Sequence, residues 1–109
     1  MSAEHARDLK KKPVKLLSVA QGTQKGWGDL LENDDEKLYA TAGFQAIQKN
    51  LFEMAGLTPQ DIDVVQLYEN FSAQGIASLI DHGFCTYENV AEFVKFENLI
   101  APSGKLPIN

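Results

Sequence analysis

The chain has 109 residues and a formal net charge of −5, with 44% hydrophobic and 23% charged residues. This composition fits one small folded domain and excludes a disordered chain, a bilayer-spanning run of about 20 apolar residues and a general attraction to nucleic acid. The single cysteine, Cys85, excludes an internal disulfide and a multi-cysteine zinc site. We therefore expect a cytoplasmic protein with no nucleic-acid partner, no membrane span and no metal.

The N-terminal residues are predicted to form a short helix followed by a buried strand. Residues 2–11 carry Ala and Leu at a spacing of three, and Pro13 ends this helix. Residues 14–20 are apolar on both faces, which predicts a strand buried within a sheet. The region is also basic. We interpret its charges as exposed surface, with an anionic ligand such as a nucleotide phosphate as the alternative. The cations are Arg7, Lys10, Lys11, Lys12 and Lys15.

Residues 37–55 form the clearest predicted helix. Apolar side chains recur there every three or four residues and make one stripe. The stripe contains Ala40, Phe44, Ile47, Leu51 and Met54. Gly56 stands where a left-handed C-cap is expected. Thr58, Pro59 and Asp61 then combine an N-cap, a proline at the first helical position and an acid at the third, which predicts a short helical turn.

A second buried strand is predicted at residues 63–68, and another helix follows it. Asn70 or Ser72 is the expected cap of this helix, and residues 82–83 are expected to end it. Its inward stripe is expected to contain Ala73, Ile76, Ala77 and Ile80.

The pattern is less regular beyond residue 84. Residues 92–96 alternate and predict a strand or an extended loop, residues 101–104 predict a turn, and residues 105–108 predict another extended segment. The order of helix, strand, helix, strand, helix and extended segment predicts an α/β fold with helices layered on a mostly parallel sheet.

The candidate site lies where the second strand ends. Tyr68 and Glu69 follow this strand directly, and ligands of α/β sheets bind at the carboxyl ends of strands. A phenol and a carboxylate there can donate a hydrogen bond or transfer a proton. The alternative is structural, with Tyr68 as a boundary residue and Glu69 as an acid favoured at the start of a helix. Cys85 follows a helix end, where nothing lowers its pKa, and is expected to be a small buried side chain.

Three motifs resemble the C-terminal half of thiolases, and are most similar to the sterol-carrier and lipid-transfer branch. Residues 55–71 (AGLTPQDIDVVQLYENF), 83–85 (GFC) and 98–109 (NLIAPSGKLPIN) occur in the order of that family. Residues 2–14 also resemble the helix and strand that enter this half. The resemblance covers nearly the whole chain.

The resemblance implies roles for Tyr68 and Glu69. In thiolases the position of Tyr68 holds a residue that helps form an oxyanion hole for the acyl thioester. In the lipid-transfer branch, which includes retro-aldolases of steroid side-chain acyl-CoAs, this residue is often Tyr. Glu69 stands where the branch usually has Asp. Such groups suit proton transfer or enolate stabilisation beside a thioester carbonyl. We therefore name Tyr68 and Glu69 as candidate catalytic residues.

The sequence also departs from the family. Residues 86–92 replace a loop that is normally glycine-rich, and Cys85 matches neither catalytic cysteine of thiolases. The nucleophilic-cysteine loop, the Gly-His-Pro loop and the late Cys-x-Gly loop have no counterpart in these 109 residues. We expect residues 1–109 to be one partial C-terminal thiolase-like domain, a half-domain incomplete at its C-terminus.

Two functions remain open at this point. The first is a fragment of a thiolase-like acyl-CoA acyltransferase, of the acetyl-CoA acetyltransferase or lipid-transfer type, which acts on fatty or sterol acyl-CoA and is not catalytic alone. The alternative is a non-catalytic acyl-CoA-binding, lipid-binding or structural subunit that completes a partner chain, as in a retro-aldolase complex. Both imply a coenzyme A thioester as the substrate, no covalently bound cofactor, and either self-association or a thiolase-like partner chain.

Overall fold

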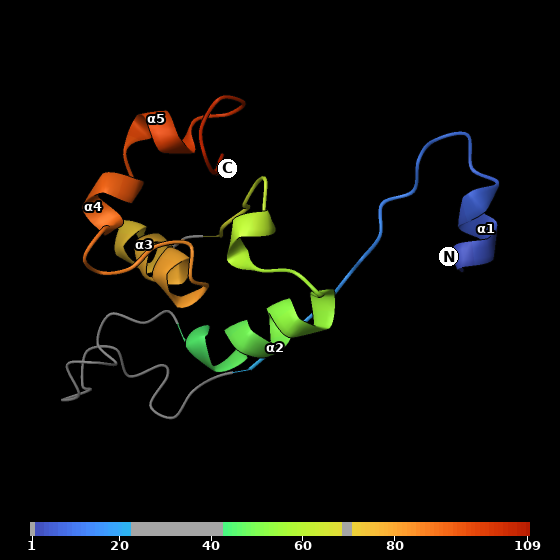
Figure 1. Ribbon diagram of the computed structural model, residues 1–109, viewed down its shortest axis with the longest axis horizontal. Coiled ribbons are helices and arrows are strands. Elements are labelled where there is room, and N and C mark those ends of the chain that lie inside the picture. The colour runs from blue at the N-terminus through green and yellow to red at the C-terminus, as the bar shows by residue number, and fades with distance from the viewer. Residues whose placement is uncertain (1, 23–42, 69–70) are drawn as a thin grey trace.

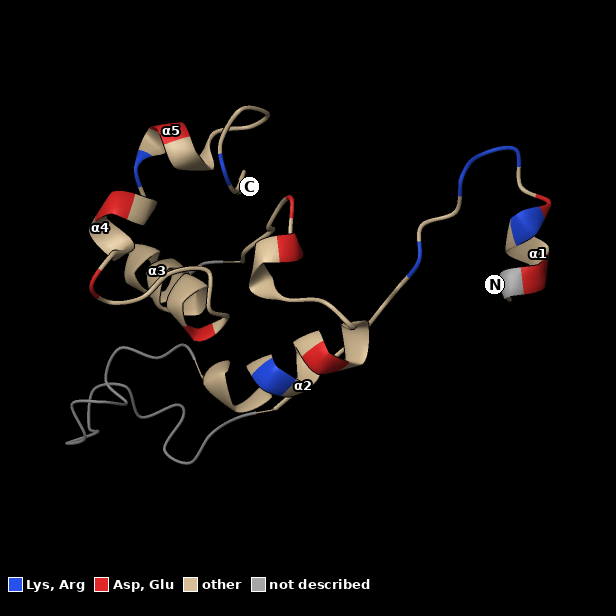
Figure 2. Ribbon diagram, viewed as in Figure 1, with Lys and Arg blue, Asp and Glu red and all other residues tan. Residues whose placement is uncertain are grey.

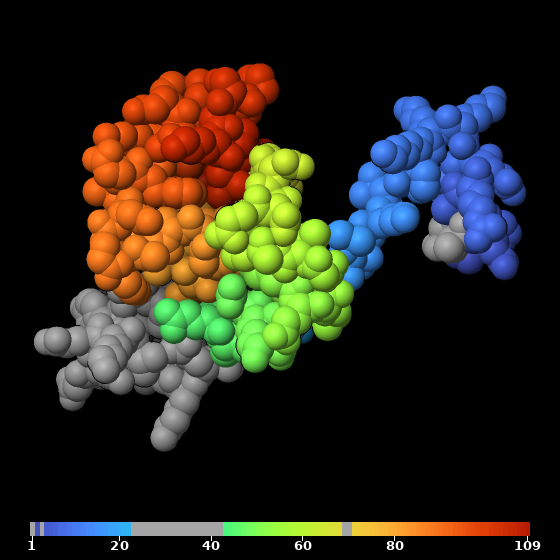
Figure 3. Space-filling model, viewed as in Figure 1, coloured from blue at the N-terminus to red at the C-terminus, as the bar shows by residue number. Residues whose placement is uncertain are grey.

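The computed structural model describes residues 2–22, 43–68 and 71–109. Its helices are α1 (Ala3–Arg7), α2 (Gln45–Ala55), the 3-10 helix η1 (Pro59–Asp61), α3 (Ser72–Asp81), α4 (Val90–Phe93) and α5 (Phe96–Leu99). Helices α2 to α5 gather into one body, and an extended segment runs from this body to α1 at the N-terminus (Figure 1). The space-filling view shows α1 and the residues after it projecting from the body (Figure 3).

Two extended segments pair in parallel through Val65 and Ile108. The Val65 N–H donates to the carbonyl of Pro107 at 3.0 Å, and the Asn109 N–H donates to the carbonyl of Val65 at 3.2 Å. The Leu67 N–H donates to the carbonyl of Asn109 at 3.3 Å. The predicted extended segment at the C-terminus is thereby confirmed. Within the described ranges this bridge is the only strand pairing. Of the predicted mostly parallel sheet, the described residues therefore form one parallel pair.

The burial predicted for the two strands is wrong for most of their residues. Residues 14–20 are extended, yet Val14 is 98% exposed and Leu16 is 82% exposed. In the second segment Val65 is buried, whereas Val64 is 59% exposed. An apolar strand is buried only where layers cover both of its faces. No second layer covers these segments among the described residues, and most of their hydrophobic side chains are therefore exposed.

Helix α2 confirms the C-terminal part of the predicted helix. It begins at Gln45, and residues 37–42 of the prediction lie outside the described residues. Gly56 ends it with φ of 68°, the left-handed conformation that glycine adopts without a steric penalty. The buried side chain is Phe52, whereas Met54 of the predicted stripe is 62% exposed. The inward face is thus rotated from the predicted one.

The predicted turn at residues 58–61 is confirmed as η1, which has Pro59 at its first position. The Thr58 N–H donates to Asp61 Oδ2 at 2.8 Å, and the Thr58 hydroxyl donates to the same oxygen at 2.7 Å. Because these bonds join groups three residues apart, the local sequence is sufficient to specify this turn.

Helix α3 supplies much of the core. Its buried residues are Gly75, Ala77, Ser78, Leu79 and Asp81. The predicted stripe is therefore only partly right, because Ala77 is buried while Ala73 and Ile76 are exposed. The predicted cap Ser72 is also wrong, since Phe71 occupies the cap position without a side-chain hydrogen bond, and Asn70 lies outside the described residues.

The predicted end of α3 is confirmed, and it docks the helix against α2. His82 is the C-cap residue, and Gly83 follows with φ of 80°. The Phe44 N–H donates to Asp81 Oδ2 at 3.1 Å, which ties the residue before α2 to the last turn of α3. The rings of Phe44 and His82 lie 5.0 Å apart, and Phe52 meets Phe84 edge-on at 6.4 Å. These two ring contacts pack α2 and its N-cap residue against the residues that follow α3.

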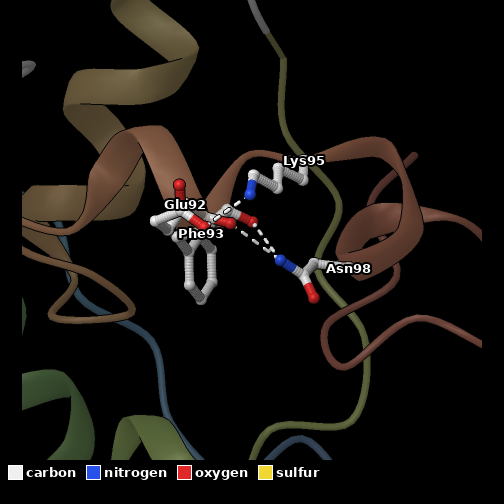
Figure 4. A network of polar contacts seen from close by, with 4 residues as sticks. All are labelled: Glu92, Phe93, Lys95 and Asn98. Atoms are coloured by element: carbon white, nitrogen blue, oxygen red, sulfur yellow. Dashed lines mark hydrogen bonds and ion pairs between the residues drawn. The ribbon is translucent and has the colours of Figure 1, made fainter.

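The strand or extended loop predicted at residues 92–96 is wrong, because the short helices α4 and α5 meet there. The Asn98 side-chain amide donates to the carbonyls of Glu92 at 2.8 Å and Phe93 at 3.2 Å (Figure 4). Lys95 pairs with Glu92 at 2.5 Å on the exposed side. Asn98 thus satisfies carbonyls at the end of α4 that the helix leaves free, which favours helix over strand. Residues 101–104 form the predicted turn.

Candidate functional site

Tyr68 lies directly after the paired segment, at its carboxyl end. The Leu67 N–H is fixed by the Asn109 carbonyl, so the backbone that leads into Tyr68 is held by the parallel pair. The side chain itself is 94% exposed, and within the described part of the chain no hydrogen bond engages its hydroxyl. The phenol is therefore accessible to a ligand or to another chain.

Glu69, the second candidate residue, lies outside the described residues. Beyond it the chain resumes at Phe71, whose carbonyl accepts from the N–H groups of Gln74 and Gly75 at 2.9 and 3.2 Å. The N–H groups of Ser72 and Ala73 precede the first of these bonds and form the positive end of α3. Tyr68 and Phe71, the residue before α3, are thus three positions apart along the chain.

A cavity of about 370 Å³ borders the segment that leads to Tyr68. Its lining includes Leu17 and Ser18 of the N-terminal extended segment and residues 64–67 of the segment before Tyr68. The remaining lining comes from α2 and from residues after α2 and α3, namely Leu51, Phe52, Ala55, Leu57, Ile62, His82 and Phe84. Residues of both extended segments thus line one largely apolar space beside the candidate site.

Cys85 does not take part in this site. Its residue is 5% exposed, and burial raises the pKa of its thiol. A raised pKa keeps the thiol protonated and unreactive at neutral pH. Cys85 is the single cysteine of the sequence, and its expected role as a small buried side chain is confirmed. Burial also raises the pKa of Tyr87, with a smaller contribution from the charge of Asp81.

No group of three or more His, Cys, Asp or Glu side chains suited to a metal ion occurs among the described residues. None of the described helices has the length and apolar character needed to span a membrane.

A family model described as "Thiolase C-terminal domain-like" matches residues 30–109. The chain belongs to this family. The match includes both partners of the Val65–Ile108 bridge, Tyr68 and all of α2 to α5. The resemblance to the C-terminal half of thiolases is therefore confirmed, and the observed body of helices around one parallel pair is a thiolase-like C-terminal fold.

Two relatives of this thiolase-like chain match nearly all of it. The 17-hydroxy-3-oxo-4-pregnene-20-carboxyl-CoA lyase of Mycobacterium tuberculosis is 31% identical over 108 residues, 99% of this chain. The steroid side-chain-cleaving aldolase of Thermomonospora curvata is 28% identical over 109 residues, the whole chain. An acetyl-CoA acetyltransferase of Methanothermobacter thermautotrophicus is 33% identical over 82 residues, 75% of this chain.

A solved structure also superposes on the thiolase-like chain. The structure named "Ltp2-ChsH2(DUF35) aldolase" matches 98% of this chain with a TM-score of 0.82 and 27% sequence identity. The chain spans 28% of the length of the lyase, of the aldolase and of this solved chain, and 20% of the acetyltransferase. The similarity therefore concerns one part of each relative.

Proposed function

We propose that this chain forms the C-terminal part of a thiolase-like enzyme that cleaves a carbon–carbon bond in an acyl-CoA, acting as one component of an aldolase assembly. The observation that carries the proposal is the match of 99% and 100% of the chain to a carboxyl-CoA lyase and a steroid side-chain-cleaving aldolase, together with the exposed side chain of Tyr68 at the carboxyl end of the paired segment. The substrate would be an acyl-CoA with a bulky apolar acyl group such as a steroid side chain.

Aldol cleavage needs two proton transfers beside a thioester carbonyl. A base removes the proton of the β-hydroxyl group, the adjacent C–C bond breaks, and the electron pair passes into a thioester enolate that an acid then protonates. In this proposal Tyr68 donates a hydrogen bond to the enolate oxygen or supplies the proton. Glu69 acts as the base. The exposure of Tyr68 supports the assignment, because the group must be accessible to a substrate.

We also propose that residues 14–20 extend the parallel sheet that the family resemblance implies. Val65 and Leu67 direct their N–H groups to the C-terminal segment, so the backbone groups of Val64 and Gln66 point to the opposite edge. Val64 and Gln66 line the cavity that Leu17 and Ser18 also line. Residues 14–20 would then add a third parallel strand in the complete protein, residues 1–109 would form one partial domain, and the cavity would close.

A partner region is also part of the proposed function. The exposed apolar segment and the 28% coverage of the relatives both support a thiolase-like partner region, supplied by a longer chain or by another subunit. We propose a cytoplasmic oligomer that takes an acyl-CoA as its substrate, without a covalently bound cofactor.

A chimera tests the function. The matching part of a complete homologous aldolase is replaced by this chain, and cleavage of a β-hydroxy steroid side-chain acyl-CoA is followed by release of the ketone. Tyr68→Phe is expected to lower turnover about 10²–10³-fold, the usual cost of one oxyanion donor or proton-transfer group. Tyr87→Phe is the matched control, because it removes a phenol from outside the site. Parental turnover in the Tyr68→Phe chimera would contradict the proposal.

The second candidate is acyl transfer, which the 33% identity to an acetyl-CoA acetyltransferase supports. Thiolysis needs an activated thiolate, and the one thiol of this chain is buried with a raised pKa. The isolated chain should therefore not cleave acetoacetyl-CoA in the presence of CoA. In the chimera, thiolysis of acetoacetyl-CoA without aldol cleavage would favour the acyltransferase.

A further inference from the structure

A second concavity lies at the N-terminal end of the molecule. Its volume is about 980 Å³, and its lining comes from α1 and the residues that follow, up to Leu17. Four of the lining residues are cations, namely Arg7, Lys11, Lys12 and Lys15. The apolar side chains beside them include Leu9 and Pro13. This concavity, which we call the basic pocket, shares only Leu17 with the cavity near Tyr68.

Among the described residues, the charges of the basic pocket have no carboxylate partner. No carboxylate is among its described lining residues, although Glu4 and Asp8 lie on the same segment. In the described ranges no carboxylate oxygen lies within 4.0 Å of its Lys and Arg nitrogens. Elsewhere Lys49 pairs with Glu53 at 3.7 Å, and Lys95 pairs with Glu92. The cations of the pocket are therefore available to an external anion.

The pocket also opposes the charge of the rest of the chain. Residues 1–15 hold five cations and two acids, a net charge of +3, whereas the whole chain carries −5, so the remaining residues carry −8. Figure 2 shows the basic residues along the N-terminal segment, apart from the acids of the helical body. An anion is thus drawn to the N-terminal end and repelled by the remainder.

We propose that the basic pocket binds the phosphate groups of a phosphorylated nucleoside, such as the nucleotide end of a coenzyme A thioester. A guanidinium binds a phosphate through two parallel hydrogen bonds, and lysines add point charges around it. Arg7 also offers a flat face for a base, while Leu9 and Pro13 offer an apolar wall for the nucleoside. The volume lies at the upper end of the roughly 300–1,000 Å³ that is usual for small-molecule pockets.

The concave shape favours a compact ligand over the surface of an anionic membrane. Four cations that line one hollow suit a compact polyanion, whereas a flat bilayer suits cations on a convex face. The assignment of the ligand to coenzyme A rests on the proposed function. The assignment to a nucleoside with several phosphates does not rest on it, since a free nucleoside diphosphate presents the same groups.

Titration calorimetry on the full chain tests the pocket. Coenzyme A, 3′-phosphoadenosine 5′-diphosphate, ADP and adenosine are the probes, and we expect the affinity to rise with the number of phosphates and to fall with added salt. Lys11→Gln with Lys12→Gln should weaken binding of 3′-phosphoadenosine 5′-diphosphate about tenfold or more, because two charge-assisted contacts are lost. Lys49→Gln with Lys105→Gln makes the same change in net charge outside the pocket and should leave the affinity unchanged.

Three results would overturn the pocket: equal weakening by both double variants, equal affinity for adenosine and ADP, or binding to phosphatidylserine vesicles without binding to any nucleotide. Equal affinity for ADP and coenzyme A would support the pocket and assign it to nucleoside diphosphates in general. The Tyr68→Phe chimera fails or succeeds independently, because these probes carry no acyl group.

Discussion

The bridge between Val65 and Ile108 determines which edge of the segment before Tyr68 is free. Val65 uses both its N–H and its carbonyl in this pair, with distances of 3.0 and 3.2 Å. Alternate residues of an extended strand direct these groups to opposite edges. Among the described residues, the backbone groups of Val64 and Gln66 therefore have no partner strand, and both residues line the cavity that Leu17 also lines.

Hydrogen exchange should follow this alternation. In the isolated chain the amides of Val65 and Leu67 are hydrogen-bonded and should exchange more slowly than those of Val64 and Gln66. In a chimera with a complete homologue, the amides of Val64 and Gln66 should also become protected, because residues 14–20 would pair with them. NMR of the two proteins measures this. Unchanged exchange of Val64 and Gln66 in the chimera would contradict the three-stranded sheet.

Leu79 should be a major determinant of stability. It is 3% exposed and, together with Leu99 and Ile108, lines a separate cavity of about 230 Å³, distinct from the cavity near Tyr68 and from the basic pocket. Leu79→Ala should lower the free energy of unfolding by about 2–5 kcal/mol, because it removes buried methyl groups and enlarges this space. Met54→Ala, at a residue that is 62% exposed, should change it by less than about 0.5 kcal/mol.

Urea unfolding compares the two variants. If Leu79→Ala leaves no folded protein, Leu79→Met keeps most of the side-chain volume and should cost under about 1.5 kcal/mol. Equal effects at Leu79 and Met54 would show that the α3 face does not form the core.

Asn98 should matter more than the ion pair next to it. Its amide satisfies the carbonyls of Glu92 and Phe93, so Asn98→Ala leaves two acceptors without this donor and should cost about 1–3 kcal/mol. Lys95→Gln removes an exposed ion pair, which contributes under about 1 kcal/mol. Thermal unfolding of the two variants measures the order, and a larger loss for Lys95→Gln would contradict it.

The capping box at Thr58 should make stability depend on acid pH. The Thr58 hydroxyl and, to a smaller extent, its N–H hold the pKa of Asp61 below its ordinary value. A lowered folded-state pKa means that the stabilisation is complete above the ordinary aspartate pKa of about 3.9 and is lost as pH falls through the folded value. Melting at pH 7 to pH 2 should show this loss.

Two variants isolate the contribution of Asp61. Asp61→Asn removes the titrating group, so the gap in melting temperature between it and the wild-type chain should shrink as pH falls below about 4. Thr58→Val removes the hydroxyl that donates to Asp61 and should weaken the pH dependence of the wild type. An acid limb that is identical in the wild-type and Asp61→Asn chains would contradict the role of the box.

The sequence predicts well the features that short-range chemistry specifies. Gly56 ends α2, Asp61 caps η1 and Gly83 ends the turn after α3, because each depends on residues within one helical turn. The position of Tyr68 after an extended segment is equally local. The helices α4 and α5 were not predicted, since their alternating apolar residues resemble a strand and the bonds of Asn98 reach back five and six residues.

Burial is the feature that the sequence predicts least well. The apolar residues of 14–20 indicate a strand with covered faces, but coverage comes from other parts of a fold. Val14 and Leu16 are exposed because no layer covers them among the described residues. The shape of the basic pocket is likewise not predictable from the sequence. The cations are visible in the sequence, whereas the hollow that they line requires α1 and residues 8–17 to curve around it.

The exposed segment should make the isolated chain self-associate. Val14, Leu16 and Val19 are 98%, 82% and 65% exposed, and in the described part of the chain no backbone hydrogen bond engages residues 14–20. An extended apolar segment with free N–H and carbonyl groups recruits another strand. Light scattering over a range of concentrations should therefore show species larger than 12.0 kDa.

Leu16→Lys should shift association to concentrations about tenfold higher or more, because each such side chain contributes about 1.5–3 kcal/mol when buried. Met54→Lys, on an exposed face of α2, should not. A monomer of 12.0 kDa with a sharp cooperative melt at every concentration would contradict this prediction.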